Sequence, residues 1–524
     1  MTVGNVFEVK KVAIIGGGIA GLTTLFELLN VKKEGTTSLK YSNSGELVSH
    51  GTTPSERAFS KIDVFEQSDQ IGGIWNPSFD DAETIDQDLL DTGKYDDPNI
   101  LRPETRIPEN LREGIYSFEK PFVTRKRQDT PKPWTRSGIY RSLFSNVPER
   151  YLRNSFMPFL NKAEEDPSLA PLIDNGQIIN QVEEFAKRFD LLKYVKLNSE
   201  VVNITKDNND NQWTLTIRNS ISEESDEWYQ ERYDAVIVSN GHYSIPYIPY
   251  IKGLDAWNKK YPGTILHSKS YRNNEIFENK NVLFIGTGLS GVDLIQYAFP
   301  VARNVYVART PGKREVYEWL GNAATSEGIQ TKPRVSSIDP EKNSVTFVDG
   351  TTVEGIDTIV LSTGYHWHYP FLSEELTGVK VKPGRNGKNP DSGSSVSGLY
   401  LNTFSIQDPT LAFVGVTITS IKWPSFELTA SAIAGVWTNK SGLPSKEDQV
   451  SSNQERLKDT GTGLEFHYYP YECFKGFASQ LEHFLPLGRQ LSDIFDEEHL
   501  ETDFERSFVV AEKLFYEYKS GQLK

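Results

Sequence analysis

The sequence carries the same glycine-turn pattern twice, and this duplication constrains the fold more than any other feature. Residues 11–21 read KVAIIGGGIAG, and residues 281–291 read NVLFIGTGLSG. In each stretch a short apolar run meets Gly-x-Gly-x-x-Gly and then helical periodicity, which predicts a strand, a tight turn and a helix. The first glycine permits the turn, the second lets the backbone approach a pyrophosphate, and the third allows close packing of the helix. The chain is therefore predicted to contain two dinucleotide-binding units.

The first unit ends on a carboxylate at the position where a dinucleotide site uses one. The next apolar strand, KIDVFE at 61–66, ends at Glu66, and an acid at this point hydrogen-bonds ribose hydroxyls. Glu66 comes later than in a compact unit because the polar, aperiodic stretch 31–60 intervenes, which we interpret as an inserted surface loop. We assign FAD to this unit. The residues expected to bind it are Gly16, Gly17, Gly18, Ile19, Ala20, Gly21 and Glu66.

The second unit has a cation in place of the carboxylate. Its next strand, NVYVART at 304–310, ends near Arg309, and Lys313 follows closely. An acid here would repel a 2'-phosphate, whereas a guanidinium pairs with it, so the pattern favours NADPH over NADH. The alternative for Arg309 is a solvated surface charge. The residues expected at the NADPH are Gly286, Gly288, Ser290, Gly291, Asp293, Arg309 and Lys313.

Net charge and cysteine content remove several functional classes. The formal net charge is -15, the wrong sign for a surface that neutralises nucleic-acid phosphates. Cys473 is the only cysteine, so an intrachain disulfide, a zinc-thiolate cage and a dithiol redox centre are excluded. Electrons that pass from a nicotinamide to a flavin must therefore be transferred to oxygen or to a small diffusible acceptor.

The sequence predicts neither a membrane span nor a metal site. No run of about 18 apolar residues occurs, and glycines interrupt the first apolar stretch, so we expect a soluble, cytoplasmic protein. Peripheral association with the endoplasmic reticulum stays open, as does the oligomeric state, a homodimer included. His366 and His368 lack a third ligand nearby in sequence, and we interpret them as packing or flavin-edge residues rather than metal ligands.

The order of the elements predicts an α/β fold with two Rossmann-like dinucleotide-binding domains, the second inserted into the first. The FAD domain is expected to comprise residues 1–240 and 366–524, with helices at its C-terminal end. The NADPH domain is expected to comprise residues 241–365. A stretch rich in proline and aspartate, 76–137, is interpreted as a second insertion that runs over the surface.

Four further stretches carry a family resemblance. YPGTILHSKSYR at 261–272 places Gly263, His267 and Tyr271 as in the motif FxGxxxHxxx(F/Y), with Tyr261 in the position of the leading Phe. IGGIW at 71–75, SNGHYSIP at 239–246 and LSTGYHW at 361–367 are similar to further signatures of the same family. The chain therefore resembles the flavin-containing monooxygenases, and its insertions resemble those of fungal members, such as the yeast flavin-containing or thiol-oxidising enzymes.

The resemblance implies a catalytic residue and further cofactor contacts. The stretch 139–152, IYRSLFSNVPERYL, resembles the family segment whose asparagine hydrogen-bonds near the reactive face of the flavin, which points to Asn146. Read from the sequence alone, Asn146 could instead cap a turn before Pro148. The other contacts implied near the cofactors are Gly73, Ile74, Trp75, Ser145, Val201, Thr363 and Gly364.

The resemblance also implies an activity. NADPH would reduce the FAD, and oxygen would add to the reduced flavin as a C4a-hydroperoxide that oxygenates a soft nucleophile, sulfur or nitrogen, in a thiol, sulfide or amine. The alternatives are a Baeyer-Villiger or N-hydroxylating monooxygenase and a non-catalytic flavin-binding protein. Tyr271-Arg272 stands where Baeyer-Villiger enzymes have Trp followed by Pro or Asp, which favours the first activity.

Overall fold

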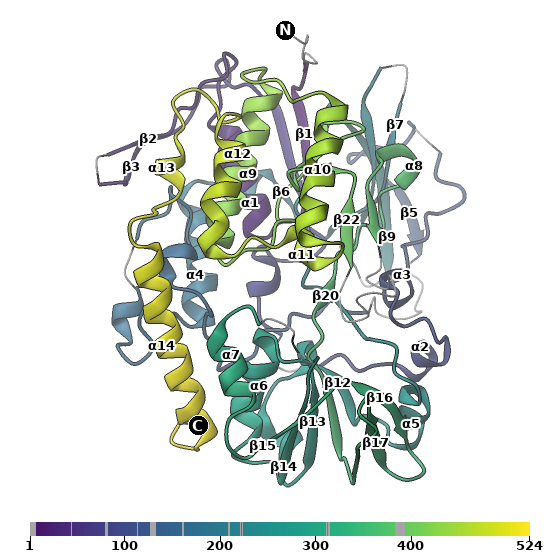
Figure 1. Ribbon diagram of the computed structural model, residues 1–524. Coiled ribbons are helices and arrows are strands. Elements are labelled where there is room, and N and C mark those ends of the chain that lie inside the picture. The colour runs from purple at the N-terminus through teal and green to yellow at the C-terminus, as the bar shows by residue number, and fades with distance from the viewer. Residues whose placement is uncertain are drawn as a thin grey trace.

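The chain forms two α/β lobes, one above the other in Figure 1. The structure, a computed structural model, describes residues 7–42, 44–78, 82–112, 114–125, 133–159, 162–207, 210–220, 222, 224–310, 312, 315–382 and 394–523. The upper lobe contains a seven-stranded sheet and the lower lobe a five-stranded parallel sheet. The prediction of an α/β fold with two Rossmann-like units is confirmed.

The upper sheet has the first glycine unit at its centre. Its strands, in spatial order, are β23 (Leu399–Tyr400), β24 (Phe404–Ser405), β25 (Leu411–Phe413), β10 (Ala235–Val238), β1 (Lys11–Ile15), β4 (Lys61–Phe65) and β6 (Val195–Lys196). β1 pairs in parallel with β4 and β10, and its last four residues are buried. Such burial on both faces requires the apolar run VAII. The helix that follows, α1 (Ile19–Leu29), is buried along its whole length and packs against α9 (Lys422–Trp437).

The lower sheet repeats this arrangement around the second glycine unit. Its order is β12 (Ile265–His267), β19 (Thr358–Leu361), β13 (Asn281–Ile285), β14 (Asn304–Ala308) and β15 (Ile329–Lys332). Helices α6 (Leu289–Ala298) and α7 (Glu318–Ala324) belong to this lobe. A hairpin of β17 (Ser344–Phe347) and β18 (Thr352–Glu354) pairs with β16 (Val335–Asp339) in a small antiparallel sheet. Two short antiparallel strands, β11 (Ile245–Pro246) and β20 (Tyr365–His366), flank the lower sheet in sequence.

The first insertion is more than a surface loop. Residues 31–60 contain a small hairpin of β2 (Lys40–Tyr41) and β3 (Leu47–Ser49), and Val31, Leu39 and Phe59 are buried in the core of the upper lobe. The surface interpretation is therefore wrong for these residues. The stretch is mostly polar and its apolar residues follow no helical or strand period, so the sequence does not signal that they are buried.

The second insertion connects the two lobes. Its helices, α2 (Gln87–Asp91) and α3 (Pro98–Leu101), and its strand, β5 (Phe122–Arg125), are separated by irregular chain. Tyr95, Leu101 and Trp134 are buried in an apolar cluster with residues of the lower lobe. β5 is the edge of an antiparallel sheet with β9 (Ser225–Tyr233), β8 (Trp213–Asn219) and β7 (Ser199–Lys206). The prediction that 76–137 runs over the surface is therefore wrong for Tyr95, Leu101 and Trp134.

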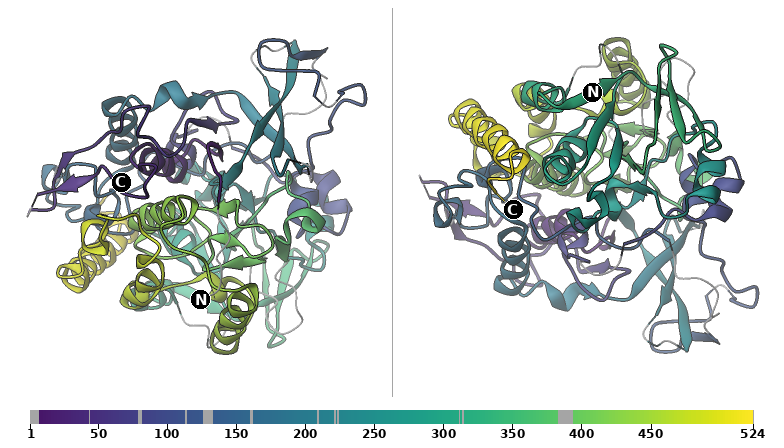
Figure 2. Two further views of the ribbon diagram at one scale, coloured as in Figure 1. Left: turned by 90° about the horizontal axis from the view of Figure 1, so that it is seen from above. Right: turned by 90° about the horizontal axis from the view of Figure 1, so that it is seen from below.

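The C-terminal helices are divided between the lobes. They are α10 (Lys446–Thr460), α11 (Leu464–His467), α12 (Phe474–Glu482), α13 (Leu491–Ile494) and α14 (Leu500–Lys519). The elements not yet named are α4 (Asn175–Arg188), α5 (Leu254–Lys260), α8 (Glu374–Thr377), β21 (Lys380–Lys382) and β22 (Ser395–Ser397). α12 packs on α9, whereas α14 packs on α6 and α7. In both views of Figure 2 the yellow α14 lies along the outside of the molecule. Within the described residues, no helix is long and apolar enough to cross a membrane.

Candidate cofactor site

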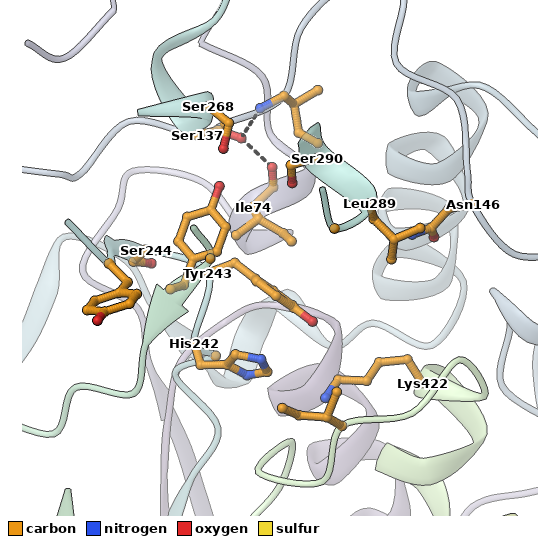
Figure 3. A pocket seen from close by; sticks show the side chains of 18 of the residues that line it. Ile74, Ser137, Asn146, His242, Tyr243, Ser244, Ser268, Leu289, Ser290 and Lys422 are labelled. Atoms are coloured by element: carbon orange, nitrogen blue, oxygen red, sulfur yellow. Dashed lines mark hydrogen bonds between the residues drawn. The ribbon is translucent and has the colours of Figure 1, made fainter. Parts of the chain in front are cut away.

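Both glycine turns open onto one cavity of about 1650 Å³. Figure 3 shows side chains from both lobes around it, among them Ile74, Ser290 and Lys422. The sequence-predicted residues that line it are Gly16, Gly18, Ile19, Ala20, Glu66, Gly73, Ile74, Trp75, Asn146, Gly286, Gly288, Ser290, Asp293, Arg309, Thr363 and Gly364. Those that do not line it are Gly17, Gly21, Ser145, Val201, Gly263, His267, Tyr271 and Gly291. Lys313 lies outside the described residues.

In the first turn, the three glycine positions differ in how the surrounding chain would tolerate a side chain. Gly16 has a φ of 110°, a conformation that side chains disfavour. A Cβ on Gly21 would lie 1.9 Å from the Gly16 carbonyl oxygen, so the helix could not start where it does. A Cβ on Gly18 would meet only Gly73, at 3.7 Å, which is an ordinary contact. The packing of the chain therefore requires Gly16 and Gly21 but leaves the space at Gly18 open.

The second turn has the same division of roles. Gly286 has a φ of 103°, and a Cβ on Gly291 would lie 2.4 Å from the Gly286 carbonyl oxygen. A Cβ on Gly288 would meet no atom within 4 Å. In both turns, then, the second glycine borders open cavity at a helix N-terminus, where backbone N–H groups and the helix dipole favour a phosphate. This geometry fits a dinucleotide pyrophosphate at each turn.

The Glu66 side chain is hydrogen-bonded to the backbone of the first turn. Its carboxylate accepts hydrogen bonds from the backbone N–H groups of Gly17, at 2.7 Å, and Ser68, at 2.8 Å. A second, smaller cavity of about 90 Å³ is lined by Gly16, Glu66 and Val201 among others. Val201 therefore lies near the first turn, although not in the main cavity.

Arg309 is not a freely solvated charge. Its Nη2 donates to Glu315 Oε1 at 3.0 Å, and the Thr287 hydroxyl donates to the same oxygen at 2.8 Å. All three residues line the main cavity beside the second turn. The guanidinium is thus held where a 2'-phosphate would replace or join the carboxylate as its partner.

Asn146 and Ser145 have different environments although they are adjacent. The Ser145 hydroxyl donates to the Val147 carbonyl at 2.8 Å and accepts from the Ile173 N–H at 3.1 Å, so it is a buried structural group. The Asn146 side chain is exposed to the main cavity and has no hydrogen-bond partner among the described residues. It does not cap the turn before Pro148, and its amide is available to a ligand.

The family-motif residues build the junction between the lobes. His267 is fully buried, its Nε2 contacts the Gly364 carbonyl oxygen at 3.0 Å, and its Nδ1 accepts from the Lys269 N–H at 3.2 Å. These two bonds require a neutral ring protonated on Nε2, and burial lowers the pKa of His267 to about 3. The Gly364 carbonyl also accepts from the Tyr247 N–H at 2.8 Å. The histidine thus fixes the Thr363-Gly364 turn that lines the cavity.

Lys422 and the imidazole of His242 are among the groups in the main cavity that sequence reasoning missed. The Lys422 ammonium donates to the carbonyl oxygens of Gly415, at 3.2 Å, and Thr417, and burial lowers its pKa to about 7. Burial and the nearby lysine hold the pKa of His242 well below its ordinary value. One feature of the sequence could have pointed to Lys422: apart from Glu427, it is the only charged residue in the apolar stretch 411–437.

Asp293 is a further predicted residue whose environment is unusual for a carboxylate. It accepts a hydrogen bond from the Tyr140 hydroxyl and another from Gln296 Nε2 at 2.8 Å. Burial raises the pKa of Asp293 to about 7. The side chain therefore joins the segment that carries Asn146 to helix α6 of the second turn.

The fold and the cavity define an oxidoreductase that brings two dinucleotides together. A family model for flavin-binding monooxygenase-like proteins matches residues 127–317 and 315–463. The chain belongs to this family, whose members use FAD and NADPH, so the resemblance seen in the sequence is confirmed. It is accordingly a flavoprotein monooxygenase.

Curated relatives and solved structures support the same conclusion. Flavin-containing monooxygenase iboF of Amanita muscaria is 27% identical over 509 residues, which cover 91% of this chain and 86% of that one. Flavin-containing monooxygenase FMO GS-OX-like 2 of Arabidopsis thaliana is 28% identical over 490 residues, with coverages of 90% and 85%. The structure of S-allyl-L-cysteine S-oxygenase from Allium sativum shares the fold with a TM-score of 0.65, at 22% identity, over 98% of this chain and 96% of that one.

Proposed function

We propose that the protein is an NADPH- and O2-dependent monooxygenase that oxygenates soft nucleophiles, sulfur or nitrogen, in thiols, sulfides or amines. The observation that carries this proposal is the single cavity onto which both pyrophosphate turns open, since the two cofactors can meet there without a protein carrier. The only cysteine, Cys473, is exposed and does not line the cavity, so no dithiol can accept the electrons. Oxygen or a small diffusible acceptor remains, and membership of the monooxygenase family favours oxygen.

The residues have distinct roles in this proposal. The first unit, with Gly18 at its open position, holds FAD, and the second unit, which we place at residues 241–365, holds NADPH. When bound, the flavin supplies the oxygenating chemistry, in the C4a-hydroperoxide form implied by the family. The chain itself positions the rings, keeps water out and offers the free amide of Asn146 as a hydrogen-bond donor and acceptor.

Product analysis with a compound panel tests the function. NADPH consumption and oxygenated product would be measured with a small thiol, a thiourea-type sulfide, a tertiary amine and a cyclic ketone. We expect product from the sulfur and amine compounds, with sulfur tested first because one structure that shares the fold is an S-oxygenase by its name. Product from the ketone alone would instead assign Baeyer-Villiger chemistry, and NADPH oxidation without any oxygenated product would contradict the proposal for this panel.

Arg309→Ala is expected to raise the KM for NADPH and to leave that for NADH nearly unchanged. Loss of a charged hydrogen bond to a phosphate costs roughly 1.5 to 3 kcal/mol, which is a tenfold to hundredfold loss of affinity. Steady-state kinetics with both cofactors would measure the effect. Glu315→Gln is the matched variant: it removes the carboxylate that competes for Arg309, so the KM for NADPH should fall. Equal losses for both cofactors in Arg309→Ala would mean that Arg309 only supports the turn.

A further inference from the structure

Arg102 is a buried cation that the described activity does not yet use. It follows α3 in the second insertion and is 6% exposed. Its side chain lines the small cavity beside the first glycine turn. The insertion therefore carries a guanidinium from the periphery of the molecule to within the reach of the candidate FAD site.

The guanidinium has too few partners for its burial. Its Nη2 donates one hydrogen bond, to Gln67 Oε1 at 2.9 Å, and no other bond of its side chain is seen within the described part of the chain. It forms no ion pair with any described residue, although charges of Glu83 and Glu66 act on it from farther away. Burial lowers its pKa to about 10. A buried cation without an ion-pair partner is costly in a folded chain unless a ligand provides the partner.

The lining of the small cavity shows which part of a ligand would enter. Gly16 belongs to the turn that takes the pyrophosphate, Glu66 stands where the ribose is recognised, and Val201 lies on the neighbouring strand β7. No residue of the second glycine turn lines it. Because Gly16 and Glu66 line it, the cavity lies beside the adenosine diphosphate half of the FAD that we assign to this turn. Glu66 and a diphosphate are both negative, so a cation at this place relieves their repulsion.

We propose that Arg102 binds the adenosine diphosphate half of FAD, by pairing with its phosphate charge or by stacking its guanidinium plane on the adenine. The proposal rests on the assignment of FAD to the first unit. It gives the second insertion a function, namely to supply the one arginine or lysine among the described residues that line the small cavity.

The test measures how tightly the purified holoenzyme retains FAD. Dilution of the yellow protein releases flavin, and the recovery of flavin fluorescence gives its Kd. We expect Arg102→Gln to raise this Kd at least about tenfold and Arg102→Lys, which keeps the charge but loses the planar fork, to raise it about threefold. The control is Arg106→Gln, an exposed arginine of the same segment, which should leave the Kd unchanged.

A second measurement distinguishes the loss of a contact with FAD from a general destabilisation of the protein. The Kd for NADP+, measured by perturbation of the flavin spectrum, should be unchanged in the Arg102 variants, because the small cavity does not touch the second turn. An unchanged FAD Kd in Arg102→Gln, or a parallel rise for FAD and NADP+, would overturn the proposal. If Arg102→Gln does not fold, Arg102→Lys decides by the same criteria. Neither result depends on which substrate is oxygenated.

Discussion

Gly18→Leu is expected to give a folded protein that is purified without its yellow colour. The backbone at Gly18 is extended, with φ -73° and ψ -179°, so leucine can adopt it without strain. Its side chain would extend from a point whose only protein neighbour is Gly73, into the space that the pyrophosphate requires. We expect FAD affinity to fall by more than about a hundredfold, which corresponds to about 2.7 kcal/mol. The flavin-to-protein ratio from absorbance measures it.

The second turn provides the matched control. Gly288→Leu makes the same change at the equivalent open position, so the protein should stay yellow while NADPH no longer reduces the flavin. Gly21→Leu would not be a useful comparison, because its Cβ would collide with the Gly16 carbonyl and disturb the turn itself. Full flavin occupancy in Gly18→Leu would show that FAD is not bound by the first unit.

Asn146→Ala is expected to separate flavin reduction from substrate oxygenation. The Asn146 amide faces the cavity and has no partner within the described chain, so its removal breaks no internal bond and should leave thermal stability unchanged. If the amide holds the cofactors in register, NADPH will still reduce the flavin in the variant. The electrons will then reduce oxygen to hydrogen peroxide, and less substrate will be oxygenated. The loss of one such hydrogen bond, roughly 1.5 to 3 kcal/mol, predicts at least a tenfold lower ratio of product to peroxide.

The control for this variant is the neighbouring hydroxyl. Ser145→Ala removes the bonds to Val147 and Ile173 that shape the turn, but the Ser145 side chain itself does not line the cavity, so no group that faces the cofactors is deleted. It should lower thermal stability but leave the ratio of oxygenated product to hydrogen peroxide unchanged. If Asn146→Ala also retains normal coupling, measured as product and peroxide formed per NADPH, the role taken from the family resemblance does not apply to Asn146.

The two nucleotide units could be predicted because their signals are local. A buried parallel strand needs a continuous apolar run, and the turn that follows needs glycine where a Cβ would strike a carbonyl, as at Gly21 and Gly291. Both requirements are satisfied within about a dozen consecutive residues, so a single sequence can display them.

The features that were missed depend on distant parts of the chain. β9 has the polar sequence SDEWYQERY and becomes a strand because β8 and the remote β5 pair with its two edges. Tyr95 and Trp134 have no apolar neighbours in sequence, and their burial comes from the lower lobe. Arg102 is likewise one arginine in a polar insertion until the fold places it beside Gly16.

The contacts of α14 and the second insertion limit how far this architecture is modular. The inserted lobe looks like a cassette in sequence, bounded by β11 and β20. In space, however, α14 covers α6 and α7, and the Lys269 ammonium donates to the Trp134 carbonyl of the insertion at 2.9 Å. In a chimaera that exchanged residues 241–365 for those of a relative, α14 and the second insertion would pack against side chains that differ from their own partners. The lobe, its helical cover and the insertion should therefore be exchanged together in engineering.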